Sequence, residues 1–379
     1  MNTQLNEEHL MIQKAARDFA QSELLPGVIE RDDKMEFPYE QVKKMGELGF
    51  LGLMVDPKYG GSGMDTISYV LAMEEISKID NSASVCMSVC NSLVNWGLEK
   101  YGTEEQKQKY LVPLAKGEKL GAFALSEPEA GSDATSQRTT AIDMGDHYLL
   151  NGTKNWITNG GNASTYLVIA QTDESKKHKG INVLIVEKGM PGFTIGAKEN
   201  KLGIRSSDTH SLMFQDVKVP KENRIGEDGF GFKFAMMTLS GGRIGIAAQA
   251  LGIASGAYEL ALKYSKERKA FGVTISEHQA IQFKLADMAT NIEAARLLIY
   301  KSAWQKDQGL NYDVSSSMAK LYASKVAMDT TIEAVQVHGG YGFVKEYHVE
   351  RLMRDAKITQ IYEGTSEVQK IVISRAVTR

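Results

Sequence analysis

The sequence is poor in cysteine, and its histidines lack the spacing of metal ligands. Among 379 residues there are two cysteines, Cys86 and Cys90, which lie four positions apart in an apolar stretch. With neither a disulfide framework nor a CxxC pair, they are interpreted as small buried residues in a protein from a reducing compartment. The seven histidines are scattered, so we expect no catalytic metal.

Long hydrophobic runs and an excess of positive charge are also missing. No stretch approaches 18 consecutive apolar residues, so we expect no membrane span. The polar, acidic start MNTQLNEEHL is neither a signal peptide nor an Arg-rich transit peptide, which favours a cytoplasmic location. The net charge of -3 argues against a general nucleic-acid binder. Without GxGxxG or GxxxxGK[ST] motifs, neither a Rossmann nor a P-loop site is indicated.

What the sequence does contain is a helical pattern at both ends and a strand pattern between them. Near the N-terminus, Leu10, Ala15 and Phe19 recur at helical spacing after a candidate N-cap, Asn6. Similar patterns continue, so residues 1–118 are predicted to form an all-α domain.

The pattern changes after this region and then changes back. Residues 119–227 contain short segments rich in Val, Ile, Thr and Tyr, such as TYLVIAQT, which predict an antiparallel β-barrel or sandwich domain. Residues 228–379 are again helical, and their long segments with short connections predict a four-helix bundle. The fold class is therefore α+β multidomain, in the order α, β, α. The expected C-terminal helices cover residues 233–268, 278–307, 313–337 and 345–377.

The segment IYEGTSE, residues 361–367, offers a candidate base. Glu363 follows an apolar-aromatic pair and precedes small residues, so its carboxylate is expected to be partly desolvated, which raises a carboxyl pKa and makes it a stronger base. The competing interpretation is a helix N-terminus capped by Thr365 or Ser366. From the pattern alone, the cap is favoured.

Other segments are ambiguous when each is read alone. FALSEPEAGSD, residues 123–133, has the hydroxyls and turn N–H groups that receive a phosphate or a ring carbonyl, but also suits an ordinary polar loop. Trp156 in NWITNGG could stack on a planar cofactor or belong to the core. Arg243, in the Gly- and Ala-rich stretch 240–257, is either buried with a partner or at a surface helix end. ERKAFG and QVHGGYGF also suit structural turns.

Taken together and in order, these motifs resemble the acyl-CoA dehydrogenase family, and among its members the short-chain (butyryl-CoA) enzymes most. The matching segments are FALSEPEAGSD, NWITNGG, GGRIG, RKAFG, QVHGGYGF and MRDAKITQIYEGTSE. The resemblance covers essentially the whole chain and agrees with the α, β, α order. It implies tightly bound FAD and oxidation of a saturated acyl-CoA to the trans-2-enoyl-CoA. Electrons would pass to electron-transferring flavoprotein, and the assembly would be a homotetramer built from two dimers.

The resemblance also implies roles for individual residues, with Glu363 as the catalytic base. The residues expected to contact the flavin are Phe123, Ala124, Leu125, Ser126, Glu127, Gly131, Ser132, Trp156, Ile157 and Thr158. A second set, assigned by motif match, is expected to bind the rest of FAD across a subunit boundary. Its members are Arg268, Phe271, Gln279, Gln336, Val337, His338, Gly339 and Gly340. Thr365, Ser366 and Glu367 would hold the cofactor on the side of the base. The substrate cleft would be lined by Ser132, Ser240, Gly241, Gly242, Arg243 and Gly364.

Two positions distinguish this chain from other members of the family. In isovaleryl- and long-chain-type relatives the catalytic Glu immediately precedes the Arg that corresponds to Arg243, where this chain has Gly242. Many relatives have Asp where this chain has Ser240, which leaves the substrate contact at this position open. Glu363 is thus the carboxylate that this chain offers at a known base position.

Two alternative functions stay open at this point. An acyl-CoA oxidase passes electrons to oxygen, although many such oxidases carry extra C-terminal domains. A non-catalytic, nucleic-acid-binding relative would need a clustered basic surface, whereas the basic excess after residue 228 is small and spread out. Spacing does not reveal the preferred acyl chain length.

Overall fold

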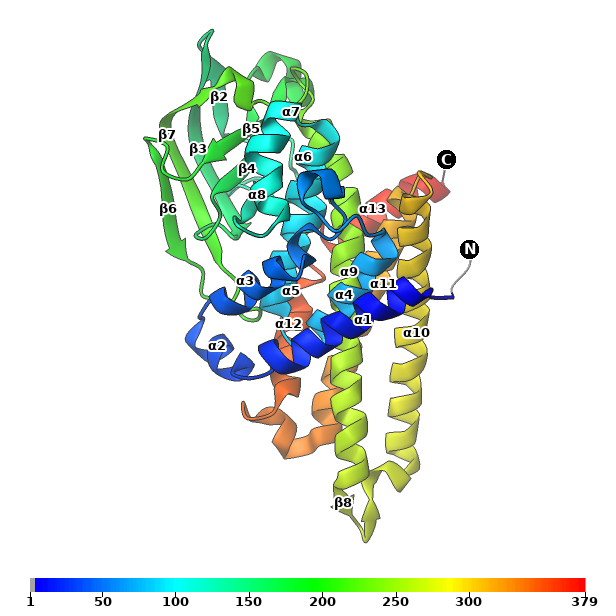
Figure 1. Ribbon diagram of the computed structural model, residues 1–379. Coiled ribbons are helices and arrows are strands. Elements are labelled where there is room, and N and C mark those ends of the chain that lie inside the picture. Colours follow the sequence, from blue (N-terminus) through cyan, green and yellow to red (C-terminus); the bar gives the residue numbers. More distant parts are fainter. Residues whose placement is uncertain (1–3, 379) are drawn as a thin grey trace.

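The computed structural model describes residues 4–378 and has the helix, strand, helix order predicted from the sequence (Figure 1). The predicted fold class is therefore confirmed. Residues 1–3 and 379, the ends of the two outer predicted domains, lie outside the described residues. The domain boundaries stay predictions; the first strand begins at Gly121, and the long helix after the sheet begins at Gly231.

The N-terminal part is a group of mostly short helices. The side chain of Asn6 accepts a hydrogen bond from the backbone N–H of His9 at 2.8 Å, which confirms the predicted N-cap. Cys86 and Cys90 are buried free thiols, as interpreted from the sequence. The helices are α1 (Glu7–Phe19), α2 (Val28–Lys34), α3 (Tyr39–Glu47), α4 (Thr66–Ser77), α5 (Asn81–Ser88), α6 (Trp96–Tyr101), α7 (Glu104–Gln106) and α8 (Val112–Ala115).

In the middle part, seven of the described strands form one sheet. Their order is β1-β4-β2-β3-β7-β6, with β5 paired to β4. Most pairs are antiparallel, as predicted, whereas β1 and β2 run parallel to β4 because the chain crosses over between them instead of turning back in a hairpin. The strands are β1 (Gly121–Ala124), β2 (Thr140–Asp143), β3 (His147–Thr158), β4 (Thr165–Gln171), β5 (Ile181–Glu187), β6 (Phe193–Lys198) and β7 (Thr209–Pro220).

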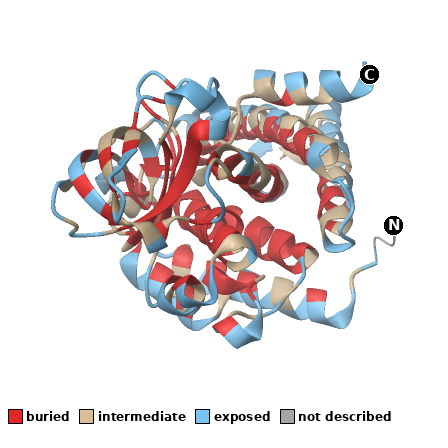
Figure 2. Ribbon diagram, turned by 90° about the horizontal axis from the view of Figure 1, so that it is seen from above, coloured by how far each residue is buried: buried red, intermediate tan, exposed pale blue. Residues whose placement is uncertain are grey.

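Both faces of the central strand β4 are buried. Leu167 and Ile169 pack in an apolar cluster that contains helix residues such as Leu93, whereas Tyr166 and Val168 pack in a second cluster on the other face. Successive side chains of a strand point to opposite faces, so one strand can serve both clusters. Figure 2 shows that buried residues concentrate along the sheet and in the central helices, with exposed residues outside. The sheet is thus joined to the helical parts through a shared core.

The C-terminal part contains three long helices that lie side by side (Figure 1). The prediction of a single helix over 345–377 was wrong, because the chain is interrupted between α12 and α13. At this break Glu363 has φ 52° and Gly364 has φ 93°, which a right-handed helix cannot accommodate. The elements are α9 (Gly231–Glu267), β8 (Lys269–Ala270), β9 (Val273–Thr274), α10 (Gln279–Asp307), α11 (Asp313–His338), α12 (His348–Ile358) and α13 (Ser366–Val377).

Helix α9 runs through the core of the protein. Among the described helices it is the one that is long and apolar enough to cross a membrane, and 83% of its most apolar window is buried inside the protein, as in a core helix. Its small residues allow close contact with α4. A Cβ at Gly252 would overlap the carbonyl oxygen of Glu74, and a Cβ at Gly256 would lie 2.6 Å from that of Lys78. The glycines therefore fix how closely α9 approaches α4.

This contact predicts that Gly252→Ala destabilises the protein. In an unconstrained helix, Gly→Ala stabilises by about 1 kcal/mol. Here the added methyl must displace the backbone of α4, and overpacking of this kind costs about 1–3 kcal/mol. Thermal unfolding should therefore show a lower Tm for Gly252→Ala than for the wild type. A Tm equal to or above the wild-type value would contradict the packing described.

Candidate active site

The candidate base, Glu363, lies in the break between α12 and α13. Glu363 and the next residue, Gly364, both have positive φ. Gly364 adopts this conformation readily, but Glu363 has a Cβ and is held in a region that such residues rarely occupy. Backbone strain of this kind persists where the surroundings enforce it, and it is concentrated at functional sites. The turn aims the carboxylate of Glu363 toward α9.

Three side chains hold this turn. The carbonyl oxygen of Gly364 accepts hydrogen bonds from Lys320 Nζ at 2.6 Å and from Gln369 Nε2 at 2.8 Å. Thr365 caps α13 by accepting a hydrogen bond from the backbone N–H of Val368 at 3.3 Å. The helix-cap interpretation of this segment is therefore confirmed for Thr365. It does not compete with a role for Glu363, because the cap begins two residues after the carboxylate.

The carboxylate of Glu363 is placed in a confined, nearly apolar site. Its Oε2 atom is buried and has no hydrogen-bond partner among the described residues. It lies against Gly242 of α9, where any Cβ would overlap Oε2 and would also come within 2.8 Å of Leu93. Burial raises the pKa of Glu363 to about 7, and the positive charges of Lys320 and Arg243 oppose this rise. A buried carboxylate without a partner is costly, which marks it as a candidate functional group.

Arg243 lies beside the base and is buried, so its alternative assignment to a surface helix end was wrong. Its Nη1 atom donates to Ser317 Oγ at 3.2 Å, and its Nε has no partner among the described residues. Burial lowers the pKa of Arg243, while the negative charges of Asp313 and Glu363 oppose this change. The hydroxyl of nearby Ser240 donates to the carbonyl of Met236 in its own helix, at 3.2 Å. Arg243 therefore supplies positive charge close to Glu363.

A polar group behind the base was not identified from the sequence. The hydroxyl of Tyr362 donates to Gln249 on α9, and Gln249 in turn donates to Ser84 at 2.9 Å. The hydroxyl of Tyr69 on α4 lies so close to Gly245 that a Cβ there would overlap it. These contacts join residues far apart in the sequence, so no local pattern signals them. They anchor the residue before Glu363 to the core.

The predicted flavin-contacting segments come together at the end of β3. Trp156 has φ 63° at a register shift in the β3–β7 pairing, and its side chain is 61% exposed. The alternative that Trp156 belongs to the core was therefore wrong. The backbone N–H of Asn155 donates to the carbonyl of Ser126 at 2.9 Å, which joins β3 to the FALSEPEAGSD segment. Ser132 in that segment is exposed. An aromatic face, a loop and hydroxyl groups thus lie close together.

A buried ion pair supports this loop, and its lysine was missed in the sequence. Lys154 Nζ donates to Glu127 Oε1 at 2.7 Å, to the carbonyl of Leu125 and to Gln137. The other carboxylate oxygen of Glu127 accepts from the backbone N–H of Arg138 at 2.6 Å. Both charges are satisfied, which makes such a buried pair tolerable. The side chain of Glu127 is therefore occupied in shaping the loop.

Thr365, Ser366 and Glu367 lie beside Glu363 at the start of α13, whereas the cofactor residues predicted from ERKAFG, Gln279 and QVHGGYGF lie at the other end of the long helices. Arg268, Val337, His338, Gly339 and Gly340 line one concave region of about 770 Å³. The predicted residues outside this lining are Phe271, Gln279 and Gln336. From position 242 to position 268 a continuous helix rises by about 39 Å. Arg268 is therefore far from Gly242 and from the candidate base beside it.

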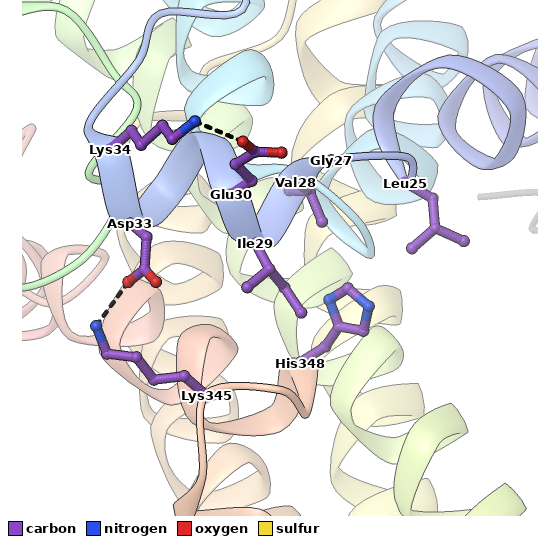
Figure 3. Close-up of a pocket in the computed structure, with 9 residues that line it drawn as sticks. All are labelled: Leu25, Gly27, Val28, Ile29, Glu30, Asp33, Lys34, Lys345 and His348. Carbon is purple, nitrogen blue, oxygen red and sulfur yellow. Dashed lines mark hydrogen bonds and ion pairs between the residues drawn. The ribbon is translucent and has the colours of Figure 1, made fainter.

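Another concave region, of about 750 Å³, lies between α2 and the start of α12 (Figure 3). Its charged residues pair with one another, Lys34 with Glu30 and Lys345 with Asp33. It contains none of the predicted site residues. Among residues 4–378 there is also no cluster of three or more His, Cys, Asp or Glu that could hold a metal ion.

A carboxylate with one buried, unpaired oxygen, together with an exposed aromatic side chain elsewhere in the site, is the arrangement expected of an enzyme that abstracts a proton and binds a planar cofactor. Comparison with known proteins makes this specific. Family models for the N-terminal, middle and C-terminal domains of acyl-CoA dehydrogenase match residues 6–118, 122–217 and 229–378. The chain belongs to the acyl-CoA dehydrogenase family.

Individual relatives match over the full length. The short-chain specific acyl-CoA dehydrogenase of Clostridium acetobutylicum is 53% identical over 379 residues, 100% of both chains. The structure of butyryl-CoA dehydrogenase from Megasphaera elsdenii is similar to this chain, with a TM-score of 0.98 and 52% identity. A chain in the structure of the electron transferring flavoprotein of Acidaminococcus fermentans is also similar, with a TM-score of 0.99 and 53% identity. Both matches cover 100% of this chain and 100% of the other chain.

The contact between Gly242 and the base predicts that Gly242→Ala impairs catalysis. The methyl group would occupy the space of Glu363 Oε2, and misplacing a catalytic group by about 1 Å can lower the rate about 100-fold. The measurement is the rate at which acyl-CoA reduces the flavin in a stopped-flow experiment. Gly252→Ala is the control on α9, because its Cβ would press on Glu74 and Ser77 and not on Glu363, so its rate of flavin reduction should stay close to that of the wild type. A wild-type rate in Gly242→Ala would refute the placement of the carboxylate.

Proposed function

We propose that this protein is an FAD-dependent acyl-CoA dehydrogenase that oxidises short-chain acyl-CoA thioesters to trans-2-enoyl-CoA and passes electrons to electron-transferring flavoprotein. The buried, unpaired carboxylate of Glu363 carries this proposal, because α-proton abstraction requires a strong base shielded from water. Membership of the family supports the reaction, and the names of the full-length relatives support short-chain substrates.

The residues present fit FAD, which the family uses. Trp156 offers an uncovered aromatic face beside the FALSEPEAGSD loop, as a planar ring requires. At the far end of the helices, a Cβ at Gly339 or Gly340 would meet nothing within 4 Å, so the backbone there is open to a ligand, and Arg268 supplies a charge suited to a diphosphate. When bound, FAD accepts the hydride from the β-carbon of the substrate.

The residues of the chain perform the acid-base part of the reaction. Glu363 takes the α-proton of the thioester in its ionised form, and the charges of Arg243 and Lys320 favour that form. Negative charge then develops on the thioester oxygen, which must be stabilised by hydrogen bonds. The backbone N–H of Glu363 donates to no described residue, so it is available for this oxygen. Apolar side chains, Leu93 and Phe123 among them, help to exclude water.

We also propose that the protein works as a homotetramer built from two dimers. The predicted cofactor residues fall into two groups, one at the end of β3 and the other at the Arg268 end of α9, which lies about 39 Å from Gly242 by helical rise. One FAD can contact both groups when one subunit supplies the residues that contact the flavin and a second copy supplies the residues around Arg268. The exposed side chain of Phe271, 97% accessible in this chain, supports a subunit contact there.

Substitution of the base tests the reaction. Glu363→Gln should keep the yellow colour of the flavin but lose acyl-CoA-dependent bleaching by about 100- to 10,000-fold, the range expected for loss of a general base. Anaerobic titrations with butyryl-, octanoyl- and isobutyryl-CoA measure this loss and identify the preferred chain. Glu30→Gln, at an exposed residue of the other concave region, is the control and should bleach normally. Normal bleaching by Glu363→Gln would contradict the proposal, and rapid reoxidation by air would favour an oxidase.

The raised pKa of the base predicts a pH dependence for the wild type. The active form of Glu363 is deprotonated, and its pKa lies at about 7 in the ligand-free protein. The kcat/KM value should therefore be constant above this pH and should fall about tenfold for each pH unit below it. Steady-state assays with electron-transferring flavoprotein as acceptor measure this profile. A profile that stays flat down to about pH 5 would contradict the burial of the carboxylate.

A further inference from the structure

Lys320 of α11 is a fully buried lysine next to the base. Its ammonium group donates to the carbonyl oxygen of Gly364 at 2.6 Å. The hydrogen bond therefore goes to a neutral group, whereas the other fully buried lysine of the active-site region, Lys154, pairs directly with the carboxylate of Glu127 at 2.7 Å. Burying a charge without a direct counter-ion costs free energy, so the position of Lys320 requires an explanation.

A hydrogen bond alone does not explain Lys320. The same carbonyl of Gly364 already accepts a hydrogen bond from the neutral amide of Gln369 at 2.8 Å. A second neutral donor would hold the turn equally well without the cost of burying a charge. What distinguishes Lys320 from such a donor is its positive charge, and the nearest functional group that benefits from this charge is the carboxylate of Glu363.

The charged and titratable groups around this pair come from several elements. Burial lowers the pKa of Lys320 to about 7; Glu363, from the turn, opposes this, Arg243 of α9 adds to it, and Glu367 of α13 opposes it. Tyr69 of α4 and Tyr362 also face Glu363, and burial raises the pKa of both hydroxyls, so they stay neutral. Arg243, and Lys320 while it is protonated, are thus the cations that stabilise ionised Glu363.

We propose that Lys320 is a positioning residue for the base, which holds the Glu363–Gly364 turn through the Gly364 carbonyl and keeps the carboxylate ionised in the resting enzyme through its charge. The inference rests on the proposed function, because the role exists only if Glu363 is the base. Arg243 cannot replace Lys320 in this role, because its guanidinium bonds Ser317 and does not hold the turn.

Three substitutions separate the charge from the hydrogen bond. Lys320→Met removes both, Lys320→Gln keeps a neutral donor, and Lys320→Arg keeps the charge. Lys325→Met is the control on the same helix, because Lys325 is exposed and pairs with Asp329. Each protein is prepared as the FAD-loaded enzyme, with flavin content and Tm measured first.

The first measurement is the rate of flavin reduction by butyryl-CoA as a function of pH. In Lys320→Met and Lys320→Gln we expect the acid limb to move about one unit to higher pH, which lowers the rate at pH 7 about fivefold and restores it at about pH 9. Lys320→Arg and Lys325→Met should keep the wild-type midpoint. If Lys320→Met fails to fold, the comparison of Lys320→Gln with Lys320→Arg still decides the question.

The second measurement does not depend on turnover. Infrared titration of the substrate-free enzyme follows the carboxyl band of protonated Glu363, which is assigned by its loss in Glu363→Gln. Its midpoint should rise in Lys320→Gln and stay at the wild-type value in Lys320→Arg. A wild-type midpoint in Lys320→Gln, or an equal loss of rate at every pH in all three Lys320 variants, would overturn the inference. If no acyl-CoA reduces the wild type, the proposed function fails instead, and the infrared titration still reports on Lys320.

Discussion

The burial of one carboxylate oxygen of Glu363, without a hydrogen-bond partner among the described residues, is the constraint on which the rest of the site depends. Removing an ionised group from water is expensive, and the cost must be offset by nearby charge or the group becomes neutral. Here Arg243 and Lys320 supply that charge from two different helices. Neither forms a direct ion pair with Glu363, which would lower the pKa of its carboxyl group further. The balance leaves a base that is strong and still ionised near neutral pH.

Helix α9 carries this constraint into the overall architecture. Gly242 leaves room for the carboxylate of Glu363, and Arg243 places a positive charge beside it. Further along the helix, Gly252 and Gly256 pack on α4 and set the position of the whole helix. At its other end lies Arg268, about 39 Å away by helical rise. Helix α9 therefore fixes the position of Glu363 and also the distance from Glu363 to the Arg268 end. Because the proposed oligomer uses the Arg268 end of a second copy, the same helix links the active site to the assembly of subunits.

The sequence was sufficient for the parts that depend on local pattern. Helical periodicity and Val- and Ile-rich segments gave the α, β, α order, and Asn6 and Thr365 cap helices where the capping rules place them. Long-range contacts were not accessible in this way. The hydrogen bond of Lys320 to Gly364 joins residues 44 positions apart, and a buried lysine in a helix gives no local signal of its partner. The break before α13 was signalled by the capping residue Thr365 but not by the apolar pattern over 345–377, which does not report the positive φ of Glu363 and Gly364.

The same geometry constrains which residue can stand at position 242. The resemblance to the family implies that some subfamilies carry the glutamate at the position of Gly242, whereas the base proposed for this chain is Glu363. A Cβ at position 242 would overlap Glu363 Oε2, so a side chain at position 242 and the carboxylate of Glu363 cannot share this space. The presence of glycine at 242 is therefore a requirement of a base at 363, and the two residues must be considered as a single feature of the site.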